Sequence, residues 1–129
     1  MIAIDTNIIV RLLTKDDAVQ YAASLQLFEA EQIFIPDTVI LETEWVLRFA
    51  YDFEPQQICA ALRKLFGLPN VALSNPYLMA QVLDWHQQGL DFADAFHLAQ
   101  SQQLPAFKTF DEKLIKAAKN LSSCVVQKP

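Results

Sequence analysis

Residues 1–13, MIAIDTNIIVRLL, place one acidic residue, Asp5, between two aliphatic runs. The four residues before Asp5 favour a short strand, and the apolar residues after Asn7 recur at helical spacing. No cation lies close to Asp5 in the sequence to neutralise it. Asp5 therefore stands at a strand-to-helix junction, where it serves either as the N-cap of the helix or as part of a site.

The same alternation of short strands and longer helical segments continues along the chain. Runs that favour strands are MIAI, QIFI, VALS, AFKTF and CVVQ. Helical periodicity predicts helices over residues 6–14, 17–31, 37–51, 55–66, 76–88, 92–103 and 111–120. This pattern predicts an α/β fold in which a parallel sheet is covered on both faces by helices of βαβ crossovers. No repeat, low-complexity run or linker interrupts it, so we expect a single domain over residues 1–129.

Composition excludes several classes of protein. The chain has 129 residues, 53% of them hydrophobic, which is enough for one globular core. No apolar stretch approaches the roughly 18 residues of a membrane span, and no basic region precedes an apolar one at the N-terminus. We therefore expect a soluble, cytoplasmic protein with no membrane partner. Cys59 and Cys124 favour reduced, buried thiols over a disulfide or zinc site. With only Gly67 and Gly89, the chain lacks a glycine-rich phosphate loop.

Charge is unevenly distributed along the chain. The formal net charge is −5, whereas phosphate binding normally rests on an excess of Lys and Arg. From residue 108 to the C-terminus, however, five lysines stand against two acids. Lys113, Lys116 and Lys119 are spaced to line one side of the predicted last helix, so they are candidates for contact with RNA phosphates. A solvated helix face explains them at least as well.

Two acids directly follow predicted strands: Asp5 follows MIAI, and Asp111 follows AFKTF. In an open parallel sheet, ligands bind outside the carboxyl ends of the strands. Distant parts of the chain can therefore deliver both carboxylates to one edge of the sheet. Asp at such a junction is also a good N-cap, so capping explains each residue alone as well as a site does.

Glu42 lies inside a predicted helix, in PDTVILETEWVLRFAY, where capping does not explain it. Its neighbour Glu44 is expected to form an exposed ion pair with Arg48, four residues further on. Glu42 instead projects between apolar side chains, where a carboxylate is costly unless it is protonated, paired or bound to a metal. The sequence favours a functional Glu42 over a structural one.

Asp94 lies in GLDFADAFHLAQSQQ, three residues after Asp91, which is expected to cap a helix. The helix dipole favours acids in the first turn, so Asp94 also has a structural explanation. Asp94, His97 and Ser101 share a polar stripe that faces either a site or water. For His97, packing or a supporting role is favoured over metal ligation.

Four acids in distant segments are thus placed where they can converge: Asp5, Glu42, Asp94 and Asp111. Clustered carboxylates repel one another, and a hard divalent cation relieves the repulsion. The predicted cofactor is therefore Mg²⁺ or Mn²⁺, as one or two ions. Such ions bridge a phosphodiester and activate a water for its hydrolysis.

With these residues in place, the chain resembles the PIN-domain family, and in particular the VapC-type toxin ribonucleases of bacterial toxin–antitoxin pairs. The matching stretches are IDTNIIVRLL, VILETEWVL, DFADAFHLA and KTFDEKLIK, which follow the family order over nearly the whole chain. The resemblance implies that the catalytic and metal-binding acids are Asp5, Glu42, Asp94 and Asp111. It also implies supporting roles for Thr6 or Asn7 and for Thr109, and Asp91 matches an acid often seen in this subgroup.

The resemblance further implies a three-layer α/β/α sandwich with a central parallel sheet of 4–5 strands. It implies Mg²⁺- or Mn²⁺-dependent endoribonuclease activity on RNA, inhibition by a small cognate antitoxin, and a homodimer. A catalytically silent PIN-like binding module and an RNA-processing nuclease without an antitoxin stay open as alternatives. A haloacid-dehalogenase-like phosphatase is disfavoured because Asn7 stands where it needs a second Asp, and a receiver domain because IDTN supplies one acid.

Overall fold

A computed structural model describes residues 1–129, and the chain divides into two compact units, Met1–Pro76 and Tyr77–Pro129. The elements of the first unit are β1 (Ile2–Ala3), α1 (Thr6–Thr14), α2 (Ala18–Ala30), β2 (Ile33–Ile35), α3 (Asp37–Tyr51), α4 (Pro55–Phe66) and β3 (Val71–Leu73). Those that follow are α5 (Pro76–Gln87), α6 (Phe92–Gln100), β4 (Ala106–Lys108), α7 (Glu112–Ala117) and β5 (Val125–Gln127). All predicted helices and strands are present, which confirms the α/β class.

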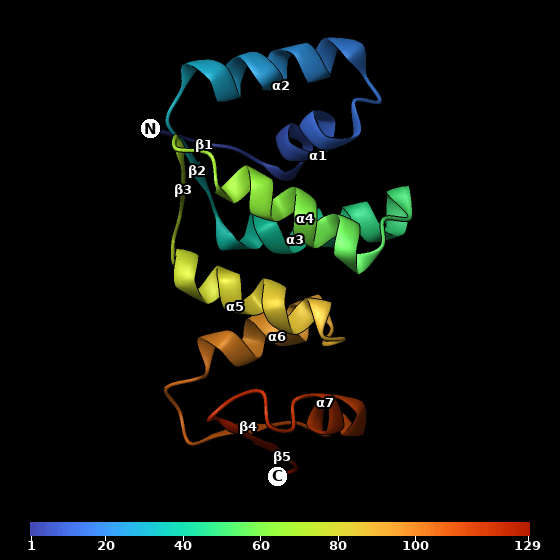
Figure 1. The fold of residues 1–129 in the computed structure, drawn as a ribbon, viewed down its shortest axis with the longest axis vertical. Coiled ribbons are helices and arrows are strands. Elements are labelled where there is room, and N and C mark those ends of the chain that lie inside the picture. The colour runs from blue at the N-terminus through green and yellow to red at the C-terminus, as the bar shows by residue number, and fades with distance from the viewer. The chain divides into compact units, whose positions relative to one another are not determined.

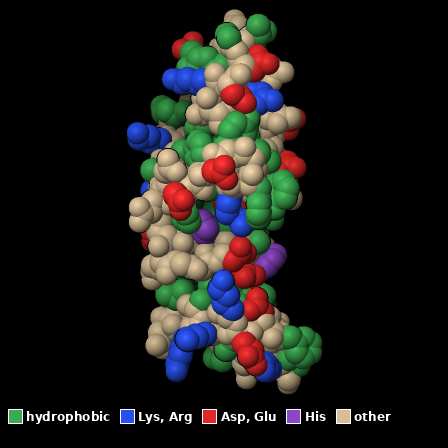
Figure 2. Space-filling view, turned by 90° about the vertical axis from the view of Figure 1, so that its right-hand side faces the viewer, with side chains coloured by type: hydrophobic (Ala, Val, Ile, Leu, Met, Phe, Trp, Pro, Cys, Tyr) green, Lys and Arg blue, Asp and Glu red, His purple; other side chains and the backbone are tan.

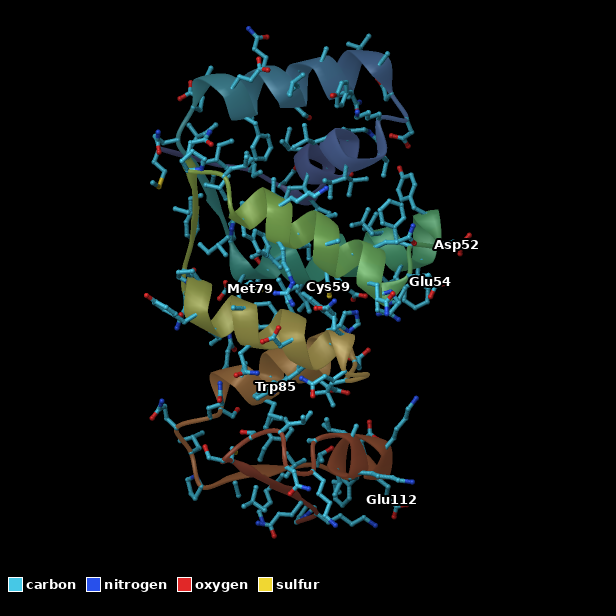
Figure 3. The ribbon with its side chains drawn as sticks, viewed as in Figure 1. Asp52, Glu54, Cys59, Met79, Trp85 and Glu112 are labelled. Atoms are coloured by element: carbon cyan, nitrogen blue, oxygen red, sulfur yellow. The ribbon has the colours of Figure 1, made fainter.

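The first unit is built on a three-stranded parallel sheet in the order β1-β2-β3. The middle strand, IFI, buries Ile33 and Ile35 completely, as expected for a β-branched run in a covered sheet. Between the strands, α1 packs against both α2 and α3, and α3 packs against α4 (Figure 1). The chain reverses from α3 into α4 at Asp52, whose φ of 56° is left-handed, and Glu54 precedes the first residue of α4 (Figure 3).

The second unit contains the parallel pair β4-β5, in which Phe107 lies opposite Val126. Helices α5 and α6 meet through the rings of His86 and Phe92, whose centroids are 5.3 Å apart in an edge-to-face arrangement. Phe92 is fully buried, and Trp85 of α5 is only 2% exposed (Figure 3). Aromatic packing therefore organises the helical part of this unit.

The sheets differ from the prediction of one central sheet of 4–5 strands. The five strands are divided between a three-stranded sheet and a two-stranded sheet. Each strand is only two or three residues long, so it offers few backbone groups for a further partner. The parallel orientation is confirmed in both sheets. The three-layer arrangement and the single domain stay predictions.

Aspartates begin most of the helices that matter for the site. The side chain of Asp5 accepts a hydrogen bond from the amide of Ile8, and Asp17 caps α2 in the same way. Asp91 and Asp111 cap α6 and α7. An Asp at this position satisfies one of the unpaired amides of the first turn and favours the helix dipole. The local sequence thus fixes where these carboxylates stand.

Candidate functional site

Asp5 lies between β1 and α1, where the sequence places it. Its side chain is exposed, and its Oδ1 accepts a hydrogen bond of 3.3 Å from the amide of Ile8. The cap uses one of the two carboxylate oxygens. Capping and ligand binding are therefore compatible at Asp5.

Glu42 is joined to the start of α1 by a side-chain hydrogen bond. The hydroxyl of the buried Thr6 donates to Oε1 of Glu42, across 36 positions of the sequence. Because Thr6 directly follows Asp5, the bond fixes the α3 carboxylate to the residue next to the α1 cap. The first unit thus ties Glu42 to the strand-to-helix junction that holds Asp5.

The two glutamates of α3 have the opposite exposure to the one expected: Glu44 is buried and Glu42 is exposed. Glu44 forms the expected ion pair with Arg48, with Nε to Oε2 at 2.7 Å and Nη2 to Oε1 at 3.2 Å. The pair is not exposed at Glu44, however, because that side chain is only 2% exposed, on the same helix face as the buried Ile40 and Leu47. Glu42 is the exposed residue. The expectation of an exposed Glu44 pair and a Glu42 among apolar side chains was wrong.

The second unit positions its acids through caps and a threonine. Oδ2 of Asp91 accepts a hydrogen bond of 3.1 Å from the backbone amide of Asp94. Oδ1 of Asp111 accepts one of 3.1 Å from the backbone amide of Leu114. The hydroxyl oxygen of Thr109 accepts a hydrogen bond of 3.0 Å from the backbone amide of Asp111. Thr109 therefore holds the backbone from which the Asp111 side chain projects.

Among the candidate site acids, Asp94 has a shifted pKa. Partial burial raises the pKa of Asp94, and the negative charges of Asp91 and Asp111 raise it further. The nearby His97 acts in the opposite direction and lowers the pKa of Asp94. The folded protein therefore disfavours the charged form of Asp94, through burial first and through its two acidic neighbours second.

The candidate acids and the threonines beside them determine which metal ion could bind. The candidate ligands are all oxygen atoms, from carboxylates with threonine hydroxyls beside them, which is the chemistry that Mg²⁺ and Mn²⁺ prefer. Both cysteines are buried free thiols. No group of three or more His, Cys, Asp or Glu side chains is gathered closely enough to hold a metal ion. The type of donor therefore suits a hard divalent cation, whereas the acids, which are distributed over both units, form no metal-holding group in this structure.

The lysines predicted to contact RNA are all exposed, but they do not share one helix. α7 ends at Ala117, so Lys113 and Lys116 belong to it while Lys119 lies beyond its end. The expectation that all three line one helix was therefore wrong for Lys119. On the same short helix, Glu112, which is labelled in Figure 3, forms an ion pair with Lys128 at 2.5 Å.

Aromatic residues next to the acids were missed as a separate feature by the sequence analysis. Trp45 and Phe49 on α3 and Phe110 beside Asp111 are exposed. The available signal was a second apolar stripe on α3, formed by Leu41, Trp45 and Phe49 at a spacing of four residues. A helix with two apolar stripes buries only one of them against a single neighbouring layer.

A family model for the PIN domain matches residues 2–120. The chain belongs to the PIN domain family. The match spans both units and includes every acid of the candidate site. PIN domains are a nuclease-type family that generally depends on divalent metal ions, which is consistent with ribonuclease activity. No curated protein matches the chain at a significant level.

None of the helices of this PIN-domain protein combines the length and the apolar character that crossing a bilayer requires.

Proposed function

We propose that this PIN-domain chain is an Mg²⁺- or Mn²⁺-dependent endoribonuclease and the toxin of a type II toxin–antitoxin pair. The observation that carries the proposal is the PIN match over residues 2–120, a range that contains Asp5, Glu42, Asp94 and Asp111. The raised pKa of Asp94, caused by burial and then by the charges of Asp91 and Asp111, supports it, because a bound cation would offset the cost of that charge.

The proposed roles follow the placement of the acids. Asp5, Glu42 and Asp94 would hold the principal metal directly or through water, and Asp111 a second or shared ion. When bound, the metal supplies charge neutralisation and lowers the pKa of water for attack on the phosphodiester. Hydrolysis would leave a 5′-phosphate and a 3′-hydroxyl.

The neighbouring polar residues would orient these ligands. The Thr6 hydroxyl donates a hydrogen bond to Glu42, which fixes the direction of its carboxylate. Thr109 holds the backbone of Asp111, and Asp91 holds the first turn of the helix that carries Asp94. Asn7, exposed in the first turn of α1, is a further supporting residue.

The proposed partners are an RNA substrate, a small cognate antitoxin and a second copy of the chain. The exposed lysines 113, 116 and 119 would contact RNA phosphates. A variant with alanine at all three positions should then show a shallower dependence of RNA affinity on salt. An unchanged slope would remove these lysines from the interface.

The central experiment is cleavage of total RNA with mapping of the new ends. Wild type with Mg²⁺ should cleave, wild type with EDTA should not, and D5N should be inactive. Asn retains a side-chain oxygen that caps the amide of Ile8, so D5N should stay folded, as circular dichroism would show. An active D5N protein would contradict the site.

Growth and co-expression separate the toxin from its alternatives. Induction of wild type, but not D5N, should arrest growth, and a neighbouring short reading frame with a basic DNA-binding N-terminus should restore it. Cleavage without arrest would indicate an RNA-processing nuclease. No cleavage by wild type in Mg²⁺ or Mn²⁺ would indicate a catalytically silent module.

A further inference from the structure

A cavity of about 440 Å³ is lined by helix α7, the turn that follows it and strand β5. All of its lining residues fall between positions 115 and 126, within the second unit. Its volume is in the range of pockets that hold a small organic ligand. None of the four candidate acids lines it, so the cavity is a feature separate from the proposed metal ligands.

Polar side chains with unused hydrogen-bonding capacity line this cavity. The carboxamide of Asn120 makes no hydrogen bond within the protein, and the ammonium of Lys119 forms no ion pair. Oγ of Ser122 accepts a hydrogen bond of 3.0 Å from the backbone amide of Cys124, which leaves its own hydrogen free to donate. A ligand in the cavity therefore meets both donors and acceptors.

The backbone explains the residue type at position 120 only in part. Asn120 has a φ of 69°, in the left-handed region that Gly and Asn adopt more readily than other residues. A Gly would satisfy this backbone as well, whereas the Asn carboxamide adds a donor and an acceptor side by side. The backbone thus accounts for an Asn or a Gly, but not for a free carboxamide that lines a cavity.

Apolar surface is available beside these polar groups. Ile115, Ala118 and Val126 contribute to the lining, so the cavity can hold a flat ring as well as hydrogen-bond its edge. A ligand that combines a planar, weakly polar ring with hydrogen-bonding groups at its rim matches this lining. A nucleobase is such a ligand.

Positive charge surrounds the cavity in an otherwise acidic chain. All five lysines of the second unit lie between residues 108 and 128, and lysine side chains stand among acidic ones at the lower end of Figure 2, which this part of the chain forms. Asp111 caps the start of α7, and the cavity lies at the other end of this helix, about 10 Å further along its axis. One strand of RNA can therefore reach both Asp111 and the cavity.

We propose that the cavity binds an unpaired adenine of the RNA close to the bond that is cleaved, and that Asn120 selects this base. The inference rests on the proposed function and names the residues that set its sequence preference. The carboxamide of Asn pairs with N6 and N7 of adenine, which present one donor and one acceptor side by side. Guanine presents two acceptors on that edge, and a pyrimidine presents one group. Lys119 holds the adjacent phosphate.

Binding without cleavage tests the base preference. Fluorescently labelled oligomers of adenylate, uridylate and cytidylate, all of one length, would be titrated with full-length D5N protein in EDTA. The adenylate oligomer should bind tighter than the other two by roughly fivefold or more. N120G keeps the left-handed backbone and removes the carboxamide, so it should lose this preference. Equal binding of the three oligomers by D5N, or a preference retained in N120G, would overturn the proposal.

Two matched substitutions separate base recognition from charge. N120D and Q103E each replace an exposed carboxamide of the second unit by a carboxylate, but Gln103 does not line the cavity. N120D should lose the preference for adenylate, and Q103E should retain it. K119Q should weaken the binding of all three oligomers alike and make it less dependent on salt. If Q103E loses the preference as N120D does, the effect comes from net charge and the proposal is wrong.

Amide NMR spectra locate the base and separate RNA from a free nucleotide. The adenylate oligomer should shift the backbone amides of Ala118, Asn120 and Val126 in D5N protein. Adenosine 5′-monophosphate should shift the same amides but bind more weakly, because it lacks the neighbouring phosphates of the strand. If the monophosphate binds as tightly as the oligomer, the cavity is a site for a free nucleotide and the proposal is wrong. Unchanged signals of these three residues would contradict it as well.

Mapping of the cleavage ends separates this proposal from the proposed function. Wild type with Mg²⁺ should cut RNA at a fixed distance from an adenine, and N120G should cut with the same metal dependence but without that preference. If wild type cleaves with no preference for adenine, the cavity proposal fails and the proposed function stands. If the adenylate oligomer binds at the cavity but wild type never cleaves, the proposed catalysis fails and the cavity stands.

Discussion

Two aspartates show how differently the two units treat a carboxylate. Asp16, between α1 and α2, is surrounded by donors: Tyr51 at 2.5 Å, Thr14 at 2.9 Å, and Arg11 at 3.0 and 3.2 Å. The Tyr51 hydroxyl, the Thr14 hydroxyl and the charge of Arg11 together lower the pKa of Asp16. This carboxylate has its counter-charge within the protein.

Asp94 has the opposite surroundings. Burial and the charges of Asp91 and Asp111 raise its pKa, and only His97 acts against them. The folded protein thus disfavours the negative charge of Asp94. The comparison teaches that an abundance of acids does not mark a site. The donors around Asp16 stabilise its charge, whereas burial and neighbouring acids disfavour the charge of Asp94.

The largest expected effect is on cleavage. D94N should reduce the rate of RNA hydrolysis by at least about a hundredfold, because it removes a charge from the proposed ligand set. D16N removes the same charge from the Asp16 network and should leave the rate near that of wild type. Initial rates at saturating Mg²⁺ compare them. Equal losses in both variants would break the distinction between the two aspartates.

The next effect is stabilisation by metal. Mg²⁺ at about a hundredfold excess over its Kd should raise the Tm of wild type by about 5 to 10 °C relative to EDTA. D16N should respond as wild type does, and D94N should show little response. Scanning calorimetry in paired buffers measures the difference. A full response in D94N would exclude Asp94 as a ligand.

Much of this organisation was predictable because it is local. The caps formed by Asp5, Asp91 and Asp111 follow from an Asp placed directly before a helical segment, and the helix positions follow from periodicity. The PIN family also followed from short stretches around the acids, and the match over residues 2–120 confirms it.

What depends on packing was not predictable. Helix α3 has two apolar stripes, and only tertiary contacts decide that the one with Ile40 and Leu47 is buried, while the one with Trp45 is exposed. For this reason the expectation that Glu44 is exposed and that Glu42 lies among apolar side chains was wrong. The division of five short strands into two sheets depends likewise on pairing between distant segments, about which periodicity says nothing.

A smaller effect tests the Asp16 side of the comparison. Y51F should lower the Tm at neutral pH by removing the donor that contributes most to the lowered pKa of Asp16. Because the folded-state pKa lies below the ordinary 3.8, this stabilisation is complete above 3.8 and is lost as the pH falls through the folded-state value. The Tm difference between Y51F and wild type should therefore shrink in acid. A constant difference would assign the Tyr51 effect to packing.

The smallest effect has the opposite sign and concerns Asp94 in EDTA. Its folded-state pKa lies above the ordinary 3.8, so the charged form destabilises the fold at neutral pH, and the penalty disappears as the pH falls below 3.8. D94N should therefore be slightly more stable than wild type near pH 7 in EDTA and no more stable in acid, as urea midpoints would show. The substitution also removes an acid from the first turn of α6, where the helix dipole favours negative charge, and this loss opposes the gain. A net stabilisation therefore means that burial, together with repulsion by Asp91 and Asp111, outweighs the helix dipole. A D94N protein less stable than wild type at pH 7 would reverse that order and place Asp94 with Asp16 among the structural carboxylates.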